Sequence, residues 1–193
     1  MNPCTDRLTR RLDLSDSREI EAYEHAFHAA FERATHNRLV RWLWEWDDAG
    51  RRLRTRIPYE DQAIWVLPSG PGSVTTGLGV NVRMRELQAS AFGFRVPDVV
   101  GPGPGERRFC EILTLFIVRR EPLRRQLAVW REVFGNLRDM GFTHAVATTA
   151  PQVLPLYRFL GARVMADACL EGEHRLFLEF DLSRVSRGNG TRR

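Results

Sequence analysis

The stretch FCEILTLFIVRREPLRRQLAVW, residues 109–130, holds a strand and the beginning of a helix. Residues 110–118 form a nearly continuous apolar run, which is typical of a strand covered on both faces. Pro122 suits the first turn of a helix. The apolar residues that follow recur at helical spacing until Gly141, a natural residue to end a helix. The stretch therefore predicts a buried strand followed by a helix over residues 122–140.

Glu111 places a carboxylate near the start of this apolar run. A charge inside a buried strand costs free energy unless a partner compensates it. Two interpretations stay open. Glu111 forms an ion pair with Arg83 or Arg108, or it serves as a catalytic base whose pKa is raised by its apolar surroundings.

The elements on both sides of this unit are predicted from hydrophobic periodicity. Residues 16–34 carry apolar residues at spacings of three and four, which indicates a helix. Residues 38–46 alternate and put three tryptophans on one side, which indicates a strand that covers a core or forms the wall of an apolar groove. Residues 84–108 are mixed and end in a loop rich in glycine and proline. Further strands are expected at 52–57, 62–67, 74–83, 143–149, 163–167 and 176–182, with a short helix that ends at Gly161.

The length of 193 residues fits one domain, expected over residues 16–183, with an N-terminal tail at 1–15 and a disordered basic tail at 184–193. All 29 basic residues are arginine, and seven of them lie in the tails together with two of the 24 acidic residues. The remaining 22 arginines and 22 acids balance, so the domain body is neutral. A neutral body argues against nucleic acid as a partner, because nucleic-acid-binding domains present a basic face.

The sequence predicts a cytoplasmic protein without a membrane span. No run of 18 apolar residues exists, and the N-terminus lacks the apolar core of a signal peptide. The three cysteines, Cys4, Cys110 and Cys169, are far apart in the sequence and have no zinc-ligand spacing, so no metal is expected.

The order of elements, a helix, a meander of strands and then strand–helix–strand–helix–strand, resembles the GNAT superfamily of acyltransferases. The stretch LYRFLGARV, residues 156–164, is similar to the family's Tyr-x-x-x-Gly-Phe element, with Tyr157 and Gly161 at matching positions and Ala162 in place of the phenylalanine. The resemblance implies an α/β fold with a central, mostly antiparallel mixed sheet, a splayed pair of strands and flanking helices.

The start of the helix departs from the superfamily's pyrophosphate loop, because residues 106–134 contain no glycine. In this respect the sequence looks more like the subgroup of N-acyl amino acid synthases and acyl-homoserine-lactone synthases. Their strand often opens Glu-Ile-Ser-Arg-Leu, and residues 111–115 read Glu-Ile-Leu-Thr-Leu. The Glu-Ile pair and the final leucine match, whereas the Ser-Arg pair does not.

The resemblance implies an enzyme that transfers an acyl group, of medium or long chain, from a thioester donor to the amine of a small molecule such as an amino acid. The donor would be acyl-CoA or the phosphopantetheine of an acyl carrier protein, which is then a protein partner. Two alternatives stay open: an acetyl-CoA-dependent N-acetyltransferase, and a non-catalytic module of this fold that binds acyl groups or proteins.

Four arginines crowd the expected start of the helix after the strand. Arginines at a helix N-terminus oppose the helix dipole, so their placement makes sense if an anion lies among them. A donor phosphate or an acidic carrier-protein surface would supply that anion, and a solvated basic turn is the alternative. These candidate donor-binding residues, together with two threonines that end the next strand, are Arg119, Arg120, Arg124, Arg125, Thr148 and Thr149.

Three residues are candidates for the chemistry of transfer. Glu111 is the candidate base, acting directly or through water. Tyr157 is the candidate acid near the leaving sulfur by carry-over from the family element, against the alternative of a packed helix residue. The backbone N–H near Val118 is the candidate oxyanion donor, because parallel strands that splay leave such groups unpaired.

Overall fold

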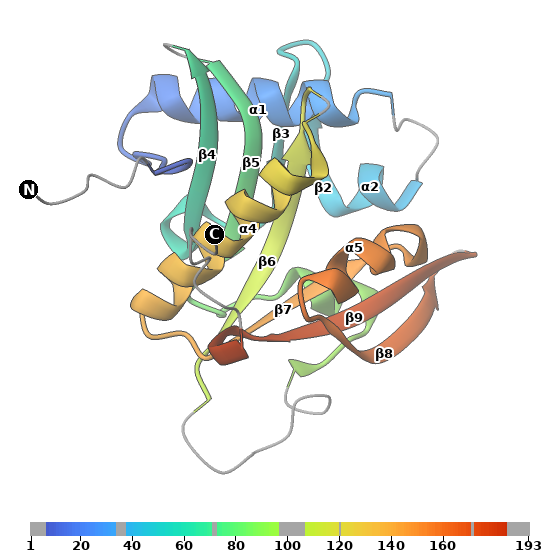
Figure 1. Ribbon diagram of the computed structural model, residues 1–193. Coiled ribbons are helices and arrows are strands. Elements are labelled where there is room, and N and C mark those ends of the chain that lie inside the picture. The colour runs from blue at the N-terminus through green and yellow to red at the C-terminus, as the bar shows by residue number, and fades with distance from the viewer. Residues whose placement is uncertain are drawn as a thin grey trace, which may run out of the picture.

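The computed structural model describes residues 7–33, 38–70, 73–96, 107–119, 121–170 and 172–184. Residues 1–6 and 185–193, which make up parts of the two expected tails, lie outside this description. Seven strands form one sheet (Figure 1), and in their order across it they are β1 (Arg10–Arg11), β4 (Gln62–Gly70), β5 (Ser73–Asn81), β6 (Phe109–Ile117), β7 (His144–Thr149), β9 (Glu173–Asp181) and β8 (Arg163–Leu170). All neighbours in this sheet are antiparallel except β6 and β7. The predicted α/β fold with a mostly antiparallel mixed sheet is confirmed.

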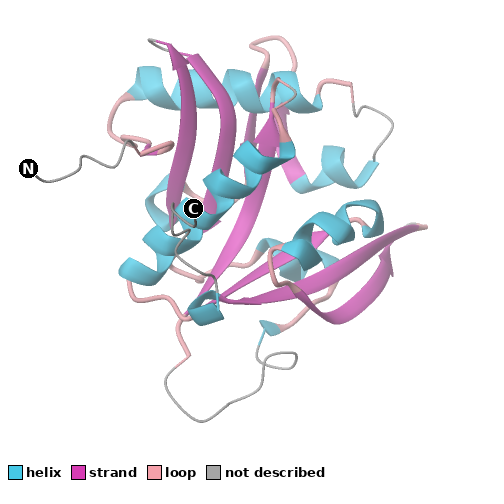
Figure 2. Cartoon of the chain, viewed as in Figure 1, coloured by secondary structure: helices cyan, strands magenta, loops and turns pink. Residues whose placement is uncertain are grey.

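Helices cover both faces of the sheet (Figures 1 and 2). On one face, α1 (Ser17–Phe31) and α2 (Arg38–Leu43) enclose a core that includes Tyr23, Phe27 and Phe116. On the other face, α4 (Leu123–Asp139) and α5 (Leu154–Phe159) enclose a second core built around Trp130 and Phe134. The apolar stripe of α4 explains its position, because its buried residues recur every three or four positions along the helix.

The parallel strands β6 and β7 separate after a short common run. In the part of the chain that the structure describes, their pairing runs from Phe109 opposite His144 to Ile112 opposite Ala147. Beyond that point β6 continues along β5, and β7 continues along β9. The two strands visibly diverge in Figure 1. The predicted splayed pair is thereby confirmed, and it opens a gap in the middle of the sheet.

The expected strand over residues 38–46 is wrong in its first half. Residues 38–43 form the helix α2, and only Trp44–Asp47 form a strand, β2, which pairs with β3 (Arg52–Thr55) in a small second sheet. The buried side chains Val40, Leu43 and Trp44 lie three and four positions apart, which is helical spacing, whereas Trp42 is 50% exposed. An alternating pattern of this length is compatible with both periods, and packing against α1 decides for the helix.

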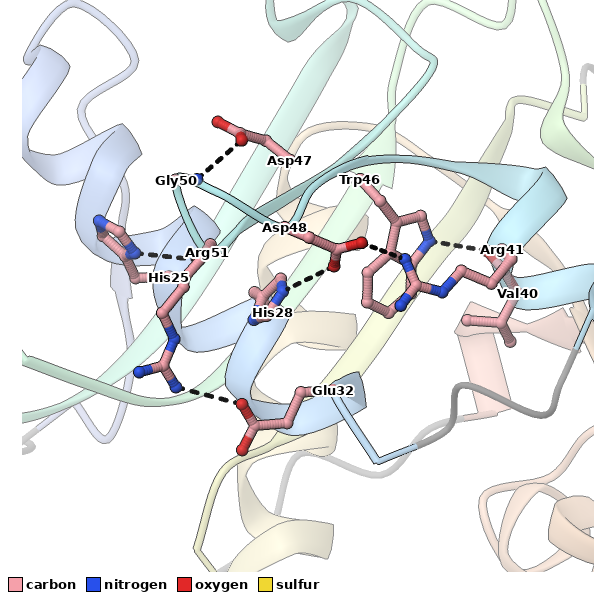
Figure 3. Close-up of polar contacts among 10 residues, drawn as sticks. All are labelled: His25, His28, Glu32, Val40, Arg41, Trp46, Asp47, Asp48, Gly50 and Arg51. Carbon is pink, nitrogen blue, oxygen red and sulfur yellow. Dashed lines mark hydrogen bonds and ion pairs between the residues drawn. The ribbon is translucent and has the colours of Figure 1, made fainter.

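A polar network fastens the segment after α1 to the end of that helix (Figure 3). Asp48 accepts a hydrogen bond from Arg41 Nη1 at 2.8 Å, and its other carboxylate oxygen lies 3.4 Å from His28 Nε2 on α1. The Arg41 guanidinium stacks 4.0 Å from the centre of the Trp46 ring, whose Nε1 donates to the Val40 carbonyl at 3.2 Å. These contacts fix α2 against α1, and α2 supplies one wall of the cavity described below.

Gly77 on β5 lies where no side chain fits. A Cβ atom there would overlap the Phe116 ring and approach Tyr23 Cε2 to 2.9 Å. We expect Gly77→Ala to lower the free energy of unfolding by about 2 kcal/mol, because overpacking a buried site forces its neighbours to shift. Urea denaturation measures the effect. The control is Gly135→Ala in the interior of α4, where nothing lies within 4 Å, and it should raise stability by up to about 1 kcal/mol. Equal effects of the two variants would contradict the packing argument.

Candidate functional site

A cavity of about 500 Å³ occupies the gap between β6 and β7. Its lining combines the inner ends of both strands with residues from both covering layers. The lining residues from the α1 and α2 side are Ala30, Phe31, Val40, Leu43 and Trp44, and those from the α4 and α5 side are Gln126, Val153, Leu156 and Tyr157. Because the lining comes from both faces, the cavity extends through the sheet.

Thr148, Thr149 and Tyr157, three of the predicted site residues, line this cavity together. Side chains alternate along β7, and Val146 packs into the core on the α1 side while Ala147 packs into the core on the α4 side. Thr148 therefore points toward α1 and α2, and Thr149 points toward α5. Burial raises the pKa of the Tyr157 phenol, and a hydrogen bond with Thr149 opposes this shift. The two ends of the cavity thus carry different hydroxyl groups.

The prediction that Val118 offers a free backbone N–H is wrong. Its N–H donates to the Thr75 carbonyl of β5 at 2.8 Å, because the antiparallel ladder of β5 and β6 extends past the end of β6. Successive residues of a strand present their N–H groups to opposite sides. The N–H groups of Leu115 and Ile117 therefore point away from β5, toward the gap where β7 has already departed. Both residues line the cavity.

Glu111 is buried, with 1% of its surface exposed, and its carboxylate is held by backbone amides. Oε1 accepts a hydrogen bond from the Ala89 N–H at 2.7 Å, and Oε2 accepts one from the Gln88 N–H at 3.0 Å. The predicted ion pair with Arg83 or Arg108 is wrong: among the described residues, Glu111 has no arginine partner, and main-chain donors take that place. Burial raises the pKa of Glu111 to about 7, and the hydrogen bonds from the Ala89 and Gln88 backbone N–H groups act in the opposite direction.

Glu111 itself does not line the cavity, but Gln88, whose N–H it holds, does. The Gln88 side chain accepts a hydrogen bond from Trp44 Nε1 at 3.0 Å and donates to the Leu113 carbonyl at 2.9 Å. Gln88 begins a short 3-10 helix, Gln88–Phe92, that forms one wall of the cavity. No sequence pattern marked Gln88, because the segment 84–108 shows no hydrophobic period and its packing depends on contacts with distant strands.

The described arginines at the start of α4 do not line the cavity. Arg119, Arg124 and Arg125 are exposed, and Arg120 lies outside the described residues. Gln126, one turn into α4, does line the cavity. The basic cluster therefore lies at the rim, on the α4 side of the sheet.

The N-terminus of α4 has no side-chain cap, because Pro122 occupies the N-cap position. Glu121 lies just before it, and its carboxylate is 3.5 Å from Arg125 Nη1. Within the described part of the chain, Arg119 and Arg124 have no ion-pair partner. A helix N-terminus with free N–H groups and arginines beside it suits an anionic ligand.

Arg175 on β9 is a site residue that the sequence analysis missed. It lines the cavity although only 9% of its surface is exposed. Its Cζ lies 5.6 Å from the centre of the Phe92 ring, and its Nη2 lies 3.6 Å from Glu173 Oε2. Its Nε is buried and has no hydrogen-bond partner. Burial lowers the pKa of this guanidinium, and the nearby Glu173 carboxylate opposes that shift. A lone arginine in an alternating strand looks like a surface charge, so no pattern marked it.

In the described segments, no group of three or more histidine, cysteine, aspartate or glutamate side chains is arranged to hold a metal ion. The helices of the same segments are all too short or too polar to cross a membrane. The cavity carries strand amides, hydroxyl groups and one buried arginine around the gap in the sheet.

No protein-family model and no curated protein matches the sequence. Among solved structures, the CoA-dependent acyl-homoserine lactone synthase BjaI with SAM and isopentyl-CoA is 18% identical, with a TM-score of 0.70, over 92% of this chain and 84% of that one. The N-acyl amino acid synthase FeeM from uncultured soil microbes is 12% identical, with a TM-score of 0.55, over 80% of this chain and 92% of that one. A putative phosphinothricin N-acetyltransferase is 14% identical, with a TM-score of 0.53, over 91% and 99% of the two chains. The chain has the GNAT-like acyltransferase fold that the sequence resemblance implied.

The pKa of Glu111 makes stability depend on pH in a defined window. The folded protein titrates this group near pH 7 and the unfolded chain near 4.5, so between these values the folded state binds more protons. We expect this group's contribution to the free energy of unfolding to be complete below pH 4.5 and to fall by about 3 kcal/mol as pH rises to 7. Urea denaturation from pH 4.5 to 8 should show this slope in wild type and not in Glu111→Gln.

The matched control for this titration is Glu60→Gln, which removes an exposed carboxylate. It should keep the wild-type slope. If Glu111→Gln also kept that slope, the raised pKa of Glu111 would be contradicted.

Proposed function

We propose that the protein is an N-acyltransferase, which moves an acyl group from a thioester donor to the amine of a small molecule. The observation that carries this proposal is the cavity between the splayed strands β6 and β7, lined by Leu115 and Ile117, whose N–H groups face the gap, and by Tyr157. The fold shared with the acyl-homoserine lactone synthase BjaI and the N-acyl amino acid synthase FeeM supports it.

The donor enters from the α4 side in this proposal. Its phosphate binds at the N-terminus of α4, beside Arg119, Arg124 and Arg125. The pantetheine arm then passes between α4 and α5 and delivers the thioester to the gap. Acyl-CoA and acyl carrier protein share this phosphopantetheine arm, so both fit the site as donors. A cytoplasmic location, where such donors are made, belongs to the same proposal.

At the gap the amine nitrogen attacks the thioester carbon. The C–N bond forms, the carbonyl oxygen becomes an oxyanion, and the C–S bond then breaks. We assign the oxyanion to the N–H groups of Leu115 and Ile117, which face the gap in place of Val118. Tyr157 supplies the proton to the departing thiolate, and Thr149 orients its hydroxyl.

The attacking amine must lose a proton, and Glu111 is the proposed acceptor. A pKa of about 7 suits a general base. Because Gln88 and not Glu111 lines the cavity, the proton reaches Glu111 through water. A base role predicts that Glu111→Gln lowers kcat and removes the acidic limb of the pH profile. A purely positioning role, through Gln88, predicts a higher KM with the pH profile retained.

The apolar end of the cavity favours a medium or long acyl chain over acetyl. Phe31, Val40 and Trp44 line it on the α1 and α2 side. A second, mostly apolar cavity of about 310 Å³ adjoins it and shares Leu43 and Gln88 with it. An acetyl group would leave most of this apolar lining without contact, whereas a longer chain would bury it.

The activity is tested by thiol release from acyl-CoA donors ranging from acetyl to dodecanoyl, and from the matching acyl carrier proteins, with a panel of small amines. We expect release that depends on the amine and is fastest with the longer chains. Tyr157→Phe should lower kcat about 100-fold with little change in the donor KM, because only the acid is lost. Tyr59→Phe is the control, since the Tyr59 hydroxyl donates to Glu24 away from the cavity. Donor binding without turnover would identify a non-catalytic module instead.

Ala30 on α1 tests the chain-length assignment. This half-buried residue lines the apolar end of the cavity. We expect Ala30→Leu to move the preferred donor toward shorter chains and to reduce kcat/KM for dodecanoyl donors about tenfold, because two or three methylenes lose their space. Ala29→Leu is the matched control: Ala29 is also half-buried on the same helix but lies outside the lining. An unchanged chain-length profile in Ala30→Leu would place the acyl chain elsewhere.

A further inference from the structure

The helix α5 and the short 3-10 turn before it, residues 151–159, form an apolar segment that stays at the surface of the protein. The segment reads PQVLPLYRF, and none of its residues is buried. Val153, Leu156 and Tyr157 line the cavity. On the outside, Val153 and Phe159 leave 43% and 66% of their surfaces exposed. An apolar element therefore borders both the cavity and the solvent.

The first turn of α4 extends this apolar surface. The helices α4 and α5 lie on the same face of the sheet (Figure 1), and the centres of the Trp130 and Tyr157 rings are 5.5 Å apart. Leu123, the first residue of α4, is 58% exposed and lies one turn before Gln126, which lines the cavity. Exposed apolar side chains that gather beside a cavity mark an interaction surface, whereas scattered ones are ordinary.

The same two segments carry exposed arginines and almost no acid. Arg119, Arg124 and Arg158 are exposed, and in the described part of the chain none of them has an ion-pair partner. The one acid in residues 118–126 and 151–159 is Glu121, whose side chain is 17% exposed and lies beside Arg125. These arginines and the exposed apolar residues form what we call the mouth surface: Arg119, Arg124, Arg158, Leu123, Val153 and Phe159. The mouth surface is basic and apolar, although the domain body as a whole is neutral.

An anionic lipid surface matches both properties of the mouth surface. At the boundary of a bilayer, apolar side chains enter the acyl region while arginines bind the lipid phosphates. An acidic carrier protein matches the charge but does not by itself account for the exposed apolar side chains. A second copy docked through the same surface would bring arginines against arginines, which opposes association.

We propose that the mouth surface docks on an anionic membrane and holds the α4-side opening of the cavity at the lipid surface. This rests on the acyl-transfer function proposed above and names a partner for it. Val153 belongs both to the cavity lining and to the mouth surface, so the two are continuous. A medium or long acyl chain then passes between the cavity and the bilayer without exposure to water, which would otherwise oppose its transfer. The acylated product enters the membrane directly.

The test is flotation of the full chain with lipid vesicles, in the absence of donor and acceptor. Vesicles of phosphatidylcholine mixed equally with phosphatidylglycerol should bind the protein, whereas vesicles of phosphatidylcholine alone should bind much less. Phe159→Ser should lower the partition coefficient about tenfold, because a phenyl ring no longer leaves water. Arg158→Gln, which leaves the proposed donor site intact, should lower it about fivefold. Added salt should weaken the binding of wild type, because it screens the arginines.

Two control variants carry the same kinds of change on the other face of the sheet. Trp42→Ser removes an exposed aromatic ring from α2, and Arg18→Gln removes an exposed arginine from α1. Both should bind vesicles as wild type does. Because Phe159 and Arg158 are not among the residues that line the cavity, their variants should keep wild-type transfer from a soluble short-chain donor. An equal loss of vesicle binding in the controls and in the mouth-surface variants would reveal unspecific adsorption and overturn the proposal.

The remaining outcomes separate this proposal from the function on which it rests. Vesicle binding without transfer to any amine contradicts the acyl-transfer function and leaves the membrane surface standing. Transfer without vesicle binding overturns the membrane surface alone. If, in addition, Phe159→Ser loses transfer only from acyl carrier protein, the carrier protein covers the mouth surface. If instead ultracentrifugation shows a wild-type dimer that Phe159→Ser dissociates, a second copy covers it.

Discussion

The separation of β6 from β7 is the constraint on which the site depends. These strands share four residue pairs, and each then follows a different antiparallel partner. The antiparallel ladders on either side are longer than the parallel one, and antiparallel pairing is slightly the more stable per residue. The outer strands therefore hold the inner pair apart. The cavity, the outward-facing amides of β6 and access to one point from both faces all follow from this divergence.

Several helices and strands were predictable because each has a recognisable hydrophobic period or a residue that ends it. The buried run of β6, the apolar stripe of α4 and the terminating glycines Gly141 and Gly161, both with φ of +89°, can be read from neighbouring residues alone. The segment at α2 could not be predicted, because the alternating pattern over residues 38–46 is compatible with both a two-residue and a helical period. Burial against α1 selected the helix, and burial is a property of the folded chain.

The site was predictable only where a motif or a strand end marked it. Tyr157, Thr148 and Thr149 were placed by such local signals and meet at the cavity. The prediction for Val118 was wrong because its N–H donates to a carbonyl of β5. The register between two strands cannot be predicted from the sequence of one strand alone. Gln88 and Arg175 were missed for the same kind of reason. Gln88 is positioned by the Glu111 carboxylate, more than twenty residues away in the sequence. Arg175 lies on β9 just beyond the last residue pair with β7.

The hydrogen bonds of Gln88 have a consequence for the acyl-transfer function proposed above. Its N–H donates to Glu111 on β6, its side chain donates to the Leu113 carbonyl on the same strand, and its side-chain oxygen accepts from Trp44 Nε1. These hydrogen bonds connect the cavity wall formed by Gln88–Phe92 to β6, the strand whose N–H groups face the gap. In the acyl transfer proposed above, a pocket of fixed depth would accept acyl chains up to a set length, and the set of products would be narrow.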